Sequence, residues 1–335
     1  MTMKVIIPVA GIGSRLRPHT HTQPKALVPV AGKPILAHIV DGLIQVGLKD
    51  FIIVIGYLGD KIEQFFREKY PDINVHFIVQ QYKEGTGQAI WMVRQLVDEH
   101  DEILIVLGDT IFDVDLKSVL TTPYSSLGIK RVEDPRSFGV VDLDKDGFIT
   151  KVIEKPNIPK SNLALVGLYK IKESALLFDM LEHNINNKIT THNEFHLTDG
   201  IARMLEAGVK MTTFPVENWY DCGNKDSLLE TNAILLKRYT DKDKEECKFD
   251  FLNTIIIPPV KIADNCKISN SIIGPNVSIG EHAIIHSSII EDSIIGSYSH
   301  LENAVLYHSV VGSDAVLRGL KQSLNIGDST EIDFK

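Results

Sequence analysis

The first apolar run of the chain is followed by glycines and cations in a spacing that suits a bound polyphosphate. The run Val5–Val9 is typical of a buried strand. The segment Ala10–Gly13 follows, and its small side chains leave backbone N–H groups open to an anion at close range. Arg15 and Lys25 place fixed positive charge where that anion would lie. A strand, a glycine loop and two cations therefore predict a site for a nucleoside triphosphate.

Two other phosphate-binding loops fit this segment poorly. In a dinucleotide fingerprint, Leu16 would have to be the third glycine, and the acidic residue expected about 20 positions later is missing from Pro29–Pro34. The Walker A pattern G-x-x-x-x-G-K-[ST] is absent. An ordinary glycine turn flanked by surface arginines is the remaining structural alternative.

The longer block from Gly11 to Pro34 resembles a family signature. It reads G-x-G-S-R-L-R-P-x-T-x-x-x-P-K-x-L-x-P-V-x-x-K-P, which is similar to the signature of the sugar-1-phosphate nucleotidylyltransferases, the glucose-1-phosphate thymidylyl- and uridylyltransferases in particular. The resemblance implies an enzyme that joins a nucleoside triphosphate to a sugar 1-phosphate and releases pyrophosphate. Further family elements follow in order, so the resemblance covers residues 3–223.

The implied reaction brings two anions together, so positioning and charge stabilisation supply most of its rate and no covalent nucleophile is needed. Magnesium needs hard oxygen ligands, and Asp109 follows the apolar run Ile103–Leu107, although an aspartate there could simply cap the next turn. The resemblance makes Asp109 and Asp221 the metal-binding aspartates. The catalytic residues that it implies are Arg15, Lys25, Asp109, Lys155 and Asp221.

Base recognition is predicted at the turn that follows Val75–Val79. A glutamine amide offers one donor and one acceptor to a base edge, and Gln80 followed by Gly85 resembles the family's pyrimidine contacts. Gln81 competes for that role. The order Glu84–Ala89 departs from the form common in thymidylyltransferases, which leaves the choice between dTTP and UTP open. The predicted nucleotide-binding residues are Ala10, Gly11, Gly13, Gln80, Gly85 and Thr86.

Sugar recognition is predicted over several separate elements. Glu154-Lys155-Pro156 resembles the family element whose lysine contacts the sugar phosphate and whose glutamate binds sugar hydroxyls. The alternative for that element alone is a solvated charge pair at a strand end. Phe138 stands where the family frequently has tyrosine. The predicted sugar-binding residues are Phe138, Gly139, Glu154, Val166, Gly167, Tyr169 and Glu194.

Composition indicates an ordinary globular enzyme. A length of 335 residues favours two domains, and the net charge of −9 argues against a nucleic-acid-binding surface. No apolar stretch is long enough for a membrane span, and the N-terminus lacks the pattern of a signal peptide. Three cysteines support neither a disulfide framework nor a zinc site. We therefore expect a cytoplasmic protein without nucleic-acid or membrane partners.

The first part of the chain alternates short apolar runs with amphipathic stretches. Apolar residues recur at helical spacing in Pro34–Val46, Asp60–Lys69 and Gly87–Val97. This alternation predicts an α/β fold, a Rossmann-like and mostly parallel sheet with helices on both faces, whose ligands bind at the carboxyl ends of the strands. The candidate strands are Val5–Val9, Asp50–Ile55, Val75–Val79, Ile103–Leu107 and Ser126–Arg131.

From Val260 onwards, apolar residues recur every five or six positions, from Ile262 to Leu317. This period is typical of hexapeptide turns and resembles the left-handed parallel β-helix of several nucleotidylyltransferases. We predict a catalytic domain over residues 1–240, a linker over 241–255, the β-helix over 256–320 and a tail or cap over 321–335. Because a β-helix leaves its end coil unpaired, we also expect a homo-oligomer with β-helix contacts.

The leading hypothesis is an Mg²⁺-dependent nucleotidylyltransferase that uses dTTP or UTP and a sugar 1-phosphate, glucose 1-phosphate first. Three alternatives stay open: a mannose-1-phosphate guanylyltransferase, a bifunctional nucleotidyl- and acetyltransferase, and a non-catalytic nucleotide-sugar sensor. His282, His286, His300 and His308 could supply a base for acyl transfer, but structural roles at coil corners are the simpler interpretation.

Overall fold

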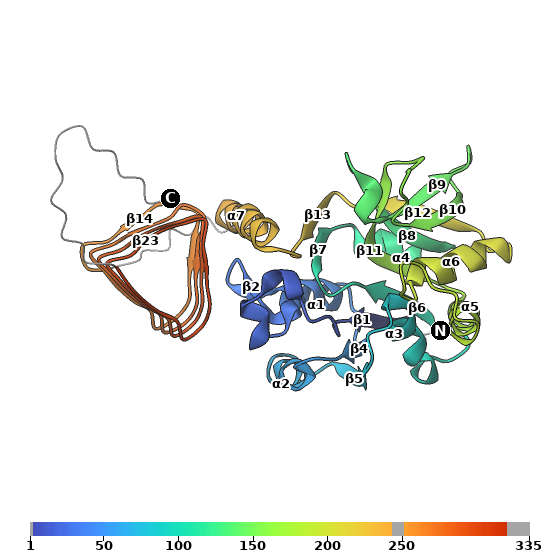
Figure 1. Cartoon of the computed structure of the whole chain (residues 1–335), viewed down its shortest axis with the longest axis horizontal. Helices are drawn as coiled ribbons and strands as arrows, with labels where there is room; N and C mark the ends of the chain where they lie inside the picture. Colours follow the sequence, from blue (N-terminus) through green and yellow to red (C-terminus); the bar gives the residue numbers. More distant parts are fainter. Residues whose placement is uncertain (1–2, 243–250, 320–335) are drawn as a thin grey trace. The chain divides into compact units, whose positions relative to one another are not determined.

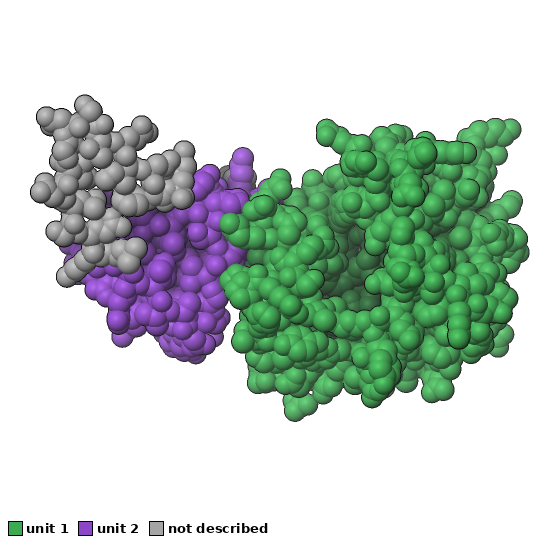
Figure 2. All heavy atoms as spheres, viewed as in Figure 1, with its two compact units in different colours: residues 1–231 green, residues 232–335 purple. Residues whose placement is uncertain are grey.

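The computed structural model describes residues 3–242 and 251–319. The chain divides into two compact units, residues 1–231 and residues 232–335, each described here by itself (Figure 2). In the described ranges, no helix has both the length and the apolar character needed to cross a membrane.

The first half of unit 1 is the parallel part of a large sheet (Figure 1). The order β6–β1–β4–β5 is parallel throughout, with Val5 opposite both Leu104 and Phe51. β1, β4 and β6 are mostly buried on both faces, which is why their sequences are nearly continuous apolar runs, whereas β5 at the edge of the sheet is partly exposed. The bounds are Met3–Pro8 for β1, Asp50–Ile55 for β4, Asn74–Val79 for β5 and Glu102–Val106 for β6, with helices α1 at Ile35–Gln45, α2 at Gly59–Lys69 and α3 at Thr86–Met92.

The second half of unit 1 makes the sheet mixed. The central strand β11, Leu163–Ile171, runs antiparallel to β6, β8 and β9, and β12 pairs in parallel with β8. The predicted parallel order therefore holds for the first half, and the second half adds antiparallel strands that the apolar pattern did not predict. The remaining bounds are β8 Ser125–Arg131, β9 Gly139–Leu143, β10 Ile149–Glu154, β12 Met211–Pro215, α4 Leu116–Thr121, α5 Ser174–Asn186 and α6 Leu197–Glu206.

Two short pairs of strands lie outside the main sheet. The β2–β3 pair, Pro29–Val30 with Lys33–Pro34, closes the loop before α1. The second pair is a ribbon of β7, Thr110–Asp113, and β13, Asn218–Asp221. Its antiparallel register sets Asp221 opposite Thr110, the residue next to Asp109. The ribbon therefore joins two segments that lie far apart in the sequence.

Unit 2 contains the predicted left-handed β-helix, with three four-stranded parallel sheets over residues 251–319 (Figure 1). Successive coils are 17 residues apart at first, as in Ile272 opposite Ile289, and then 16 apart, as in Ile289 opposite Val305. The predicted apolar positions from Ile262 to Leu301 form its core. The strands are β14 Ile255–Ile256, β15 Val260–Ile262, β16 Lys267–Ser269, β17 Ile272–Ile273, β18 Val277–Ile279, β19 Ile284–His286, β20 Ile289–Glu291, β21 Ile294–Ile295, β22 His300–Glu302, β23 Val305–Tyr307, β24 Val310–Val311 and β25 Val316–Arg318.

The corners of the β-helix use left-handed backbone conformations. Asn265, His282 and Tyr298 have φ between 57° and 61° at equivalent corners of successive coils. Asparagine tolerates this region better than most residues, which explains its frequency at these corners. His282 stacks on Tyr298 with ring centroids 4.9 Å apart, and His286 shares a hydrogen bond of 2.9 Å with Ser269. These two histidines have structural contacts, in line with the simpler interpretation above.

The boundary between the two compact units lies inside helix α7, Lys225–Lys242, and the domain bounds expected from the sequence stay a prediction. Asn232, the first residue of unit 2, has side-chain contacts within that unit, since it donates to the carbonyl of Asn276 at 3.0 Å and accepts from Ser278 at 2.9 Å. β-helix pairing also begins before residue 256, with a bridge between Leu252 and Ser269. Most of the predicted linker and the predicted tail, 321–335, lie outside the described residues.

Candidate functional site

The loops at the carboxyl ends of the parallel strands meet around one cavity of unit 1, with a volume of about 290 Å³. Its lining includes Ala10 and Gly11 after β1, Gln80 and Gly85 after β5, and Asp109 after β6. This is the arrangement expected for ligand binding in an open α/β sheet. Sequence segments predicted to lie along one edge are therefore together.

Lys25 and Asp109 form an ion pair at the wall of this cavity. Nζ of Lys25 donates to Oδ2 of Asp109 at 2.6 Å, and the two side chains are 13% and 41% exposed. Gly13 makes room for this lysine, because its φ is +66° and a Cβ there would lie 2.9 Å from the Cβ of Lys25. The glycine loop therefore leaves space for the side chain of Lys25 as well as for the phosphates that it is predicted to bind. The pair was not predicted, since the sequence suggested separate roles for its members.

Asp221 lies close enough to Asp109 for the two charges to interact. Burial raises the pKa of Asp221, the charge of Asp109 raises it further, and Lys25 and Arg15 oppose both effects. The backbone also ties the two positions together, because the N–H of Cys222 donates to the carbonyl of Asp109 at 3.2 Å. Two neighbouring carboxylates that destabilise each other's charge would be stabilised by a divalent cation.

Magnesium fits this donor set. No group of three or more His, Cys, Asp or Glu side chains surrounds a possible metal position among residues 3–242 and 251–319. A cation at Asp109 and Asp221 would therefore take its remaining oxygens from substrate and water, as Mg²⁺ commonly does.

At the base side of the cavity, the geometry favours Gln80 over Gln81. The Gln80 side chain is buried, and its Nε2 lies 3.2 Å from the carbonyl of Gly85 and 2.5 Å from Oε1 of Gln88, whereas Gln81 is exposed. Lys83 also lines the cavity, and partial burial lowers the pKa of its ammonium group. Sequence reasoning missed Lys83, although its position two residues before Gly85 was a signal.

The segment from Gln80 to Gly87 after β5, here called the base loop because it is predicted to recognise the base, is hydrogen-bonded to the loop before α6. The N–H of Gly87 donates to the carbonyl of Phe195 at 2.7 Å, and the N–H of Phe195 donates to the carbonyl of Glu84 at 2.7 Å. Thr86 completes the contact by accepting from the N–H of Leu197 at 3.2 Å. Gly85 has φ +111°, and a Cβ there would lie 2.3 Å from the carbonyl oxygen of Phe195, so the approach depends on glycine.

The predicted sugar side gathers polar groups around Glu154. Thr198 Oγ1 donates to Glu154 Oε2 at 2.8 Å, and Nζ of Lys155 lies 3.6 Å from Oε1. Lys155 has a φ of +41°, and its N–H donates to the carbonyl of Phe138 at 3.0 Å. Gly139 is closely packed, because a Cβ there would lie 3.2 Å from Oε2 of Glu154. Glu194 lines the 290 Å³ cavity itself.

Other predicted sugar-binding residues have mainly structural contacts. Val166 and Tyr169 are buried, and burial raises the pKa of Tyr169, with Glu154 adding to that effect. The carbonyl of Gly167 accepts from the N–H of Leu107 at 2.8 Å. Phe138 packs edge-on against Trp219 with ring centroids 4.8 Å apart. Val166 and Gly167 can therefore reach a sugar only through their backbones.

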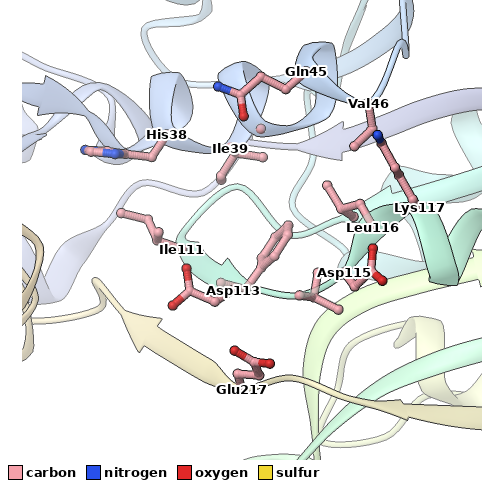
Figure 3. A pocket seen from close by; sticks show the side chains of 13 residues that line it. His38, Ile39, Gln45, Val46, Ile111, Asp113, Asp115, Leu116, Lys117 and Glu217 are labelled. Atoms are coloured by element: carbon pink, nitrogen blue, oxygen red, sulfur yellow. The ribbon is translucent and has the colours of Figure 1, made fainter. Parts of the chain in front are cut away.

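A second cavity, of about 460 Å³, lies between α1 and the β7–β13 ribbon (Figure 3). Carboxylates of Asp113, Asp115 and Glu217 line it opposite His38 and Gln45 of α1 (Figure 3). It contains none of the predicted site residues. Its acidic lining is unsuited to a nucleoside triphosphate, so the smaller cavity is the better candidate for the reaction.

Comparison with known proteins identifies the family of the chain. The family model described as nucleotidyl transferase matches residues 4–238. A bifunctional protein GlmU from Methanocaldococcus jannaschii is 37% identical over 240 residues, which are 70% of this chain and 55% of GlmU. The chain therefore spans little more than half of that relative. The low-salt glycan biosynthesis nucleotidyltransferase Agl11 of Haloferax volcanii is 32% identical, with 93% of each chain covered.

A glucose-1-phosphate thymidylyltransferase of Streptomyces griseus is 31% identical, over 88% of this chain and 87% of that one. The solved structure of a UDP-glucose pyrophosphorylase complexed with UDP-glucose covers 71% of this chain and 100% of its own, with a TM-score of 0.62 at 24% identity, which is a likeness of fold. Since the family model matches residues 4–238, the chain belongs to the nucleotidyl transferase family and is a nucleotidyltransferase.

Proposed function

We propose that this protein transfers a nucleotidyl group from dTTP or UTP to a sugar 1-phosphate, with glucose 1-phosphate the first candidate, and releases pyrophosphate. The observation that carries the proposal is the ion pair of Lys25 and Asp109 at the wall of the cavity that the loops after β1 and β5 line, with Asp221 close enough for its charge to interact with both. A site that only bound nucleotide sugars would have no need of two carboxylates that repel each other beside a phosphate-binding lysine.

The cations of the site would manage the charge of the reacting phosphates. Lys25 would hold the triphosphate, and Arg15, which is exposed on the glycine loop, would stabilise the charge that collects on the leaving pyrophosphate. Lys155 would attract the phosphate of the sugar and orient its oxygen toward the α-phosphorus. Backbone N–H groups of Gly11 and Gly13 would add hydrogen bonds to phosphate oxygens.

Mg²⁺ bound by Asp109 and Asp221 would neutralise phosphate charge and thereby favour attack at the α-phosphorus. The chain's own contribution is to hold both carboxylates in place through the β7–β13 ribbon. Lys25 would have to move from Oδ2 of Asp109 toward the phosphates when the substrate and cation bind.

Recognition of the base would fall to Gln80 with Gly85 and Thr86, and the sugar would be recognised by Glu154 and Glu194. The name of the Streptomyces griseus relative supports dTTP and glucose 1-phosphate for this chain. Because the sequence Glu84–Ala89 departs from the form common in thymidylyltransferases, UTP is proposed as a candidate substrate together with dTTP. The rival substrate pair is GTP with mannose 1-phosphate.

The testing experiment measures pyrophosphate release with Mg²⁺. Each of dTTP, UTP, GTP, CTP and ATP is paired with the 1-phosphates of glucose, N-acetylglucosamine, galactose and mannose. One strongly preferred pair supports the proposal and names the substrates. GTP with mannose 1-phosphate as the best pair would establish the guanylyltransferase alternative, and binding without turnover in the whole panel would establish the sensor alternative.

A second candidate activity is acyl transfer by the β-helix, favoured by the 37% identity to a bifunctional relative. That match covers 70% of this chain, and the structural contacts of His282 and His286 weigh against it. Release of free thiol from acetyl-CoA with glucosamine 1-phosphate as acceptor would establish this activity.

We also propose self-association through the β-helix. Ile255, Ile289 and Val305 lie in one column of an outer face, with the half-buried Ile272 between the first two, and are 59%, 47% and 76% exposed. Such an exposed apolar row favours an interface. Light scattering of the full chain and of the variant Ile289→Glu would test this, with a smaller particle expected for the variant.

A further inference from the structure

His196 is a buried polar side chain at the sugar side of the site, and it is not among the residues that the family signature implied. Its imidazole is 7% exposed, with Nδ1 3.6 Å from Oε1 of Glu154 and Nε2 3.9 Å from Oε2 of Glu194. Nε2 is buried and makes no hydrogen bond to any described residue. A buried nitrogen without a partner costs free energy, so a ligand that supplies a partner would be favoured there.

The backbone at His196 is held in place by hydrogen bonds on both sides. His196 lies between two residues that are hydrogen-bonded to the base loop, namely Phe195, which contacts Gly87, and Leu197, which contacts Thr86. Its own carbonyl accepts from the N–H of Asp199 at 3.3 Å in the first turn of α6. These contacts fix the backbone from which the imidazole extends, and so keep the ring beside Glu154 and Glu194.

The two carboxylates beside the ring, Glu154 and Glu194, differ in how many polar partners they have. Glu154 is held by Thr198 at 2.8 Å and has Lys155 at 3.6 Å from its other oxygen. Glu194 is 54% exposed and lines the 290 Å³ cavity. Its distance of 3.9 Å from Nε2 of His196 is too long for a direct hydrogen bond. A hydroxyl group is both a donor and an acceptor, so it can accept a hydrogen bond from Nε2 of His196 and donate one to the carboxylate of Glu194.

We propose that Nε2 of His196 binds one ring hydroxyl of the sugar 1-phosphate together with Glu194, and so determines which sugar is accepted. This inference rests on the proposed function of the site. Nε2 donates to the hydroxyl oxygen, and the hydroxyl donates to the carboxylate of Glu194. A sugar in which that hydroxyl is missing, or replaced by a group that cannot both donate and accept, leaves a buried polar group unpaired and is discriminated against.

The test compares three substitutions of His196 in the full-length enzyme. His196→Leu removes both nitrogens, His196→Asn keeps an amide near the position of Nδ1, and His196→Gln places an amide near the position of Nε2. The preferred substrate pair is used, and KM is measured separately for the nucleoside triphosphate and the sugar 1-phosphate. His100→Gln, an exposed histidine outside the site, is the matched control.

We expect His196→Leu and His196→Asn to lower kcat/KM for the sugar 1-phosphate by about 10- to 100-fold. KM for the triphosphate should stay within about twofold, and His196→Gln should recover most of the loss because it replaces the Nε2 donor. A panel of monodeoxy sugar 1-phosphates adds a second readout. One deoxy sugar should be as poor a substrate for the native enzyme as the full sugar is for His196→Leu, with no further loss when the two changes are combined.

Two results would overturn the inference. One is an unchanged KM for the sugar in folded His196→Leu, and the other is equal behaviour of the Asn and Gln variants, which would mean that position rather than the Nε2 donor matters. Should the leucine variant fail to fold, the Asn and Gln comparison still decides. A native enzyme that releases no pyrophosphate with any pair would remove the proposed function itself, and is thereby distinct from failure of the His196 inference.

Discussion

Replacing Asp109 with asparagine removes one charge from the site and keeps the shape of the side chain. The lost ion pair with Lys25 is partly exposed, with side chains 13% and 41% accessible, so it contributes about 1 kcal/mol or less. The same change removes a like charge beside Asp221 and thereby relieves part of the effect that raises its pKa. Because these effects oppose each other, we expect the free energy of unfolding to change by less than about 2 kcal/mol.

The effect of this substitution on catalysis should be much larger. Loss of one preorganised electrostatic contact typically costs a factor of about 100 to 1,000 in rate, and Asp109 is one of only two carboxylates proposed for the cation. We expect pyrophosphate release by Asp109→Asn to fall at least about 1,000-fold at saturating substrates, with a higher Mg²⁺ requirement for the residual rate. Pyrophosphate release over a range of Mg²⁺ concentrations and thermal unfolding of the same samples are the two measurements.

The matched control for Asp109→Asn is Asp115→Asn. Asp115 caps α4 by accepting from the N–H of Ser118 at 3.3 Å, and asparagine caps a helix about as well. This variant should keep its rate. If Asp109→Asn retained more than about a tenth of the native rate with the same Mg²⁺ dependence, Asp109 would not be a metal ligand and the charge argument would be wrong.

Further predictions concern the pH profile, the base loop and the β-helix. The pKa of Asp221 is raised, and metal binding needs its ionised carboxylate. When the pH is lowered, Mg²⁺-supported turnover should therefore begin to fall at a higher pH than an ordinary aspartate pKa of about 3.9 would give. A pH–rate profile measures this. Gln80→Ala should raise KM for the triphosphate by about tenfold, and the exposed Gln81→Ala should leave it unchanged in the same assay. Gly85→Ala should raise KM for both substrates, since its Cβ would separate the base loop from the loop before α6. Ile290→Ala in the fully buried β-helix core should destabilise that unit by about 2–5 kcal/mol in a denaturant titration while kcat stays within about twofold.

Apolar runs predicted the parallel strands well, because burial on both faces leaves β1, β4 and β6 little freedom in their composition. The five predicted strands agree with β1, β4, β5, β6 and β8 to within two residues at each end. β11 is buried over nearly its whole length and was nevertheless missed. Its run Leu163–Ile171 contains Gly167 at φ +83° and a register shift, so the sequence was read there as a short glycine motif. A glycine inside an apolar run hid the central strand of the second half.

Local sequence also could not decide between neighbours in the base loop. Val79 is exposed, Gln80 is buried and Gln81 is exposed, so the side chains alternate as the chain leaves β5. The face that points inward is set by the pairing of β5 with β4, which no single-residue pattern reveals. Lys83 was overlooked although it lies two residues before Gly85, because the sequence does not show that the path of the loop brings it to the cavity.

The pair Asp109 and Asp221 shows most clearly what a sequence motif can and cannot predict. Asp109 and Asp221 are 112 residues apart, and each alone is an ordinary aspartate after a strand. Their closeness is a backbone property, because the β7–β13 register sets Asp221 opposite Thr110 and the N–H of Cys222 donates to the carbonyl of Asp109. The resemblance could name both residues, since a family retains the result of that pairing in its motifs. It could not reveal that Lys25 forms an ion pair with Asp109 at 2.6 Å, because that contact depends on where the two side chains lie in the folded chain.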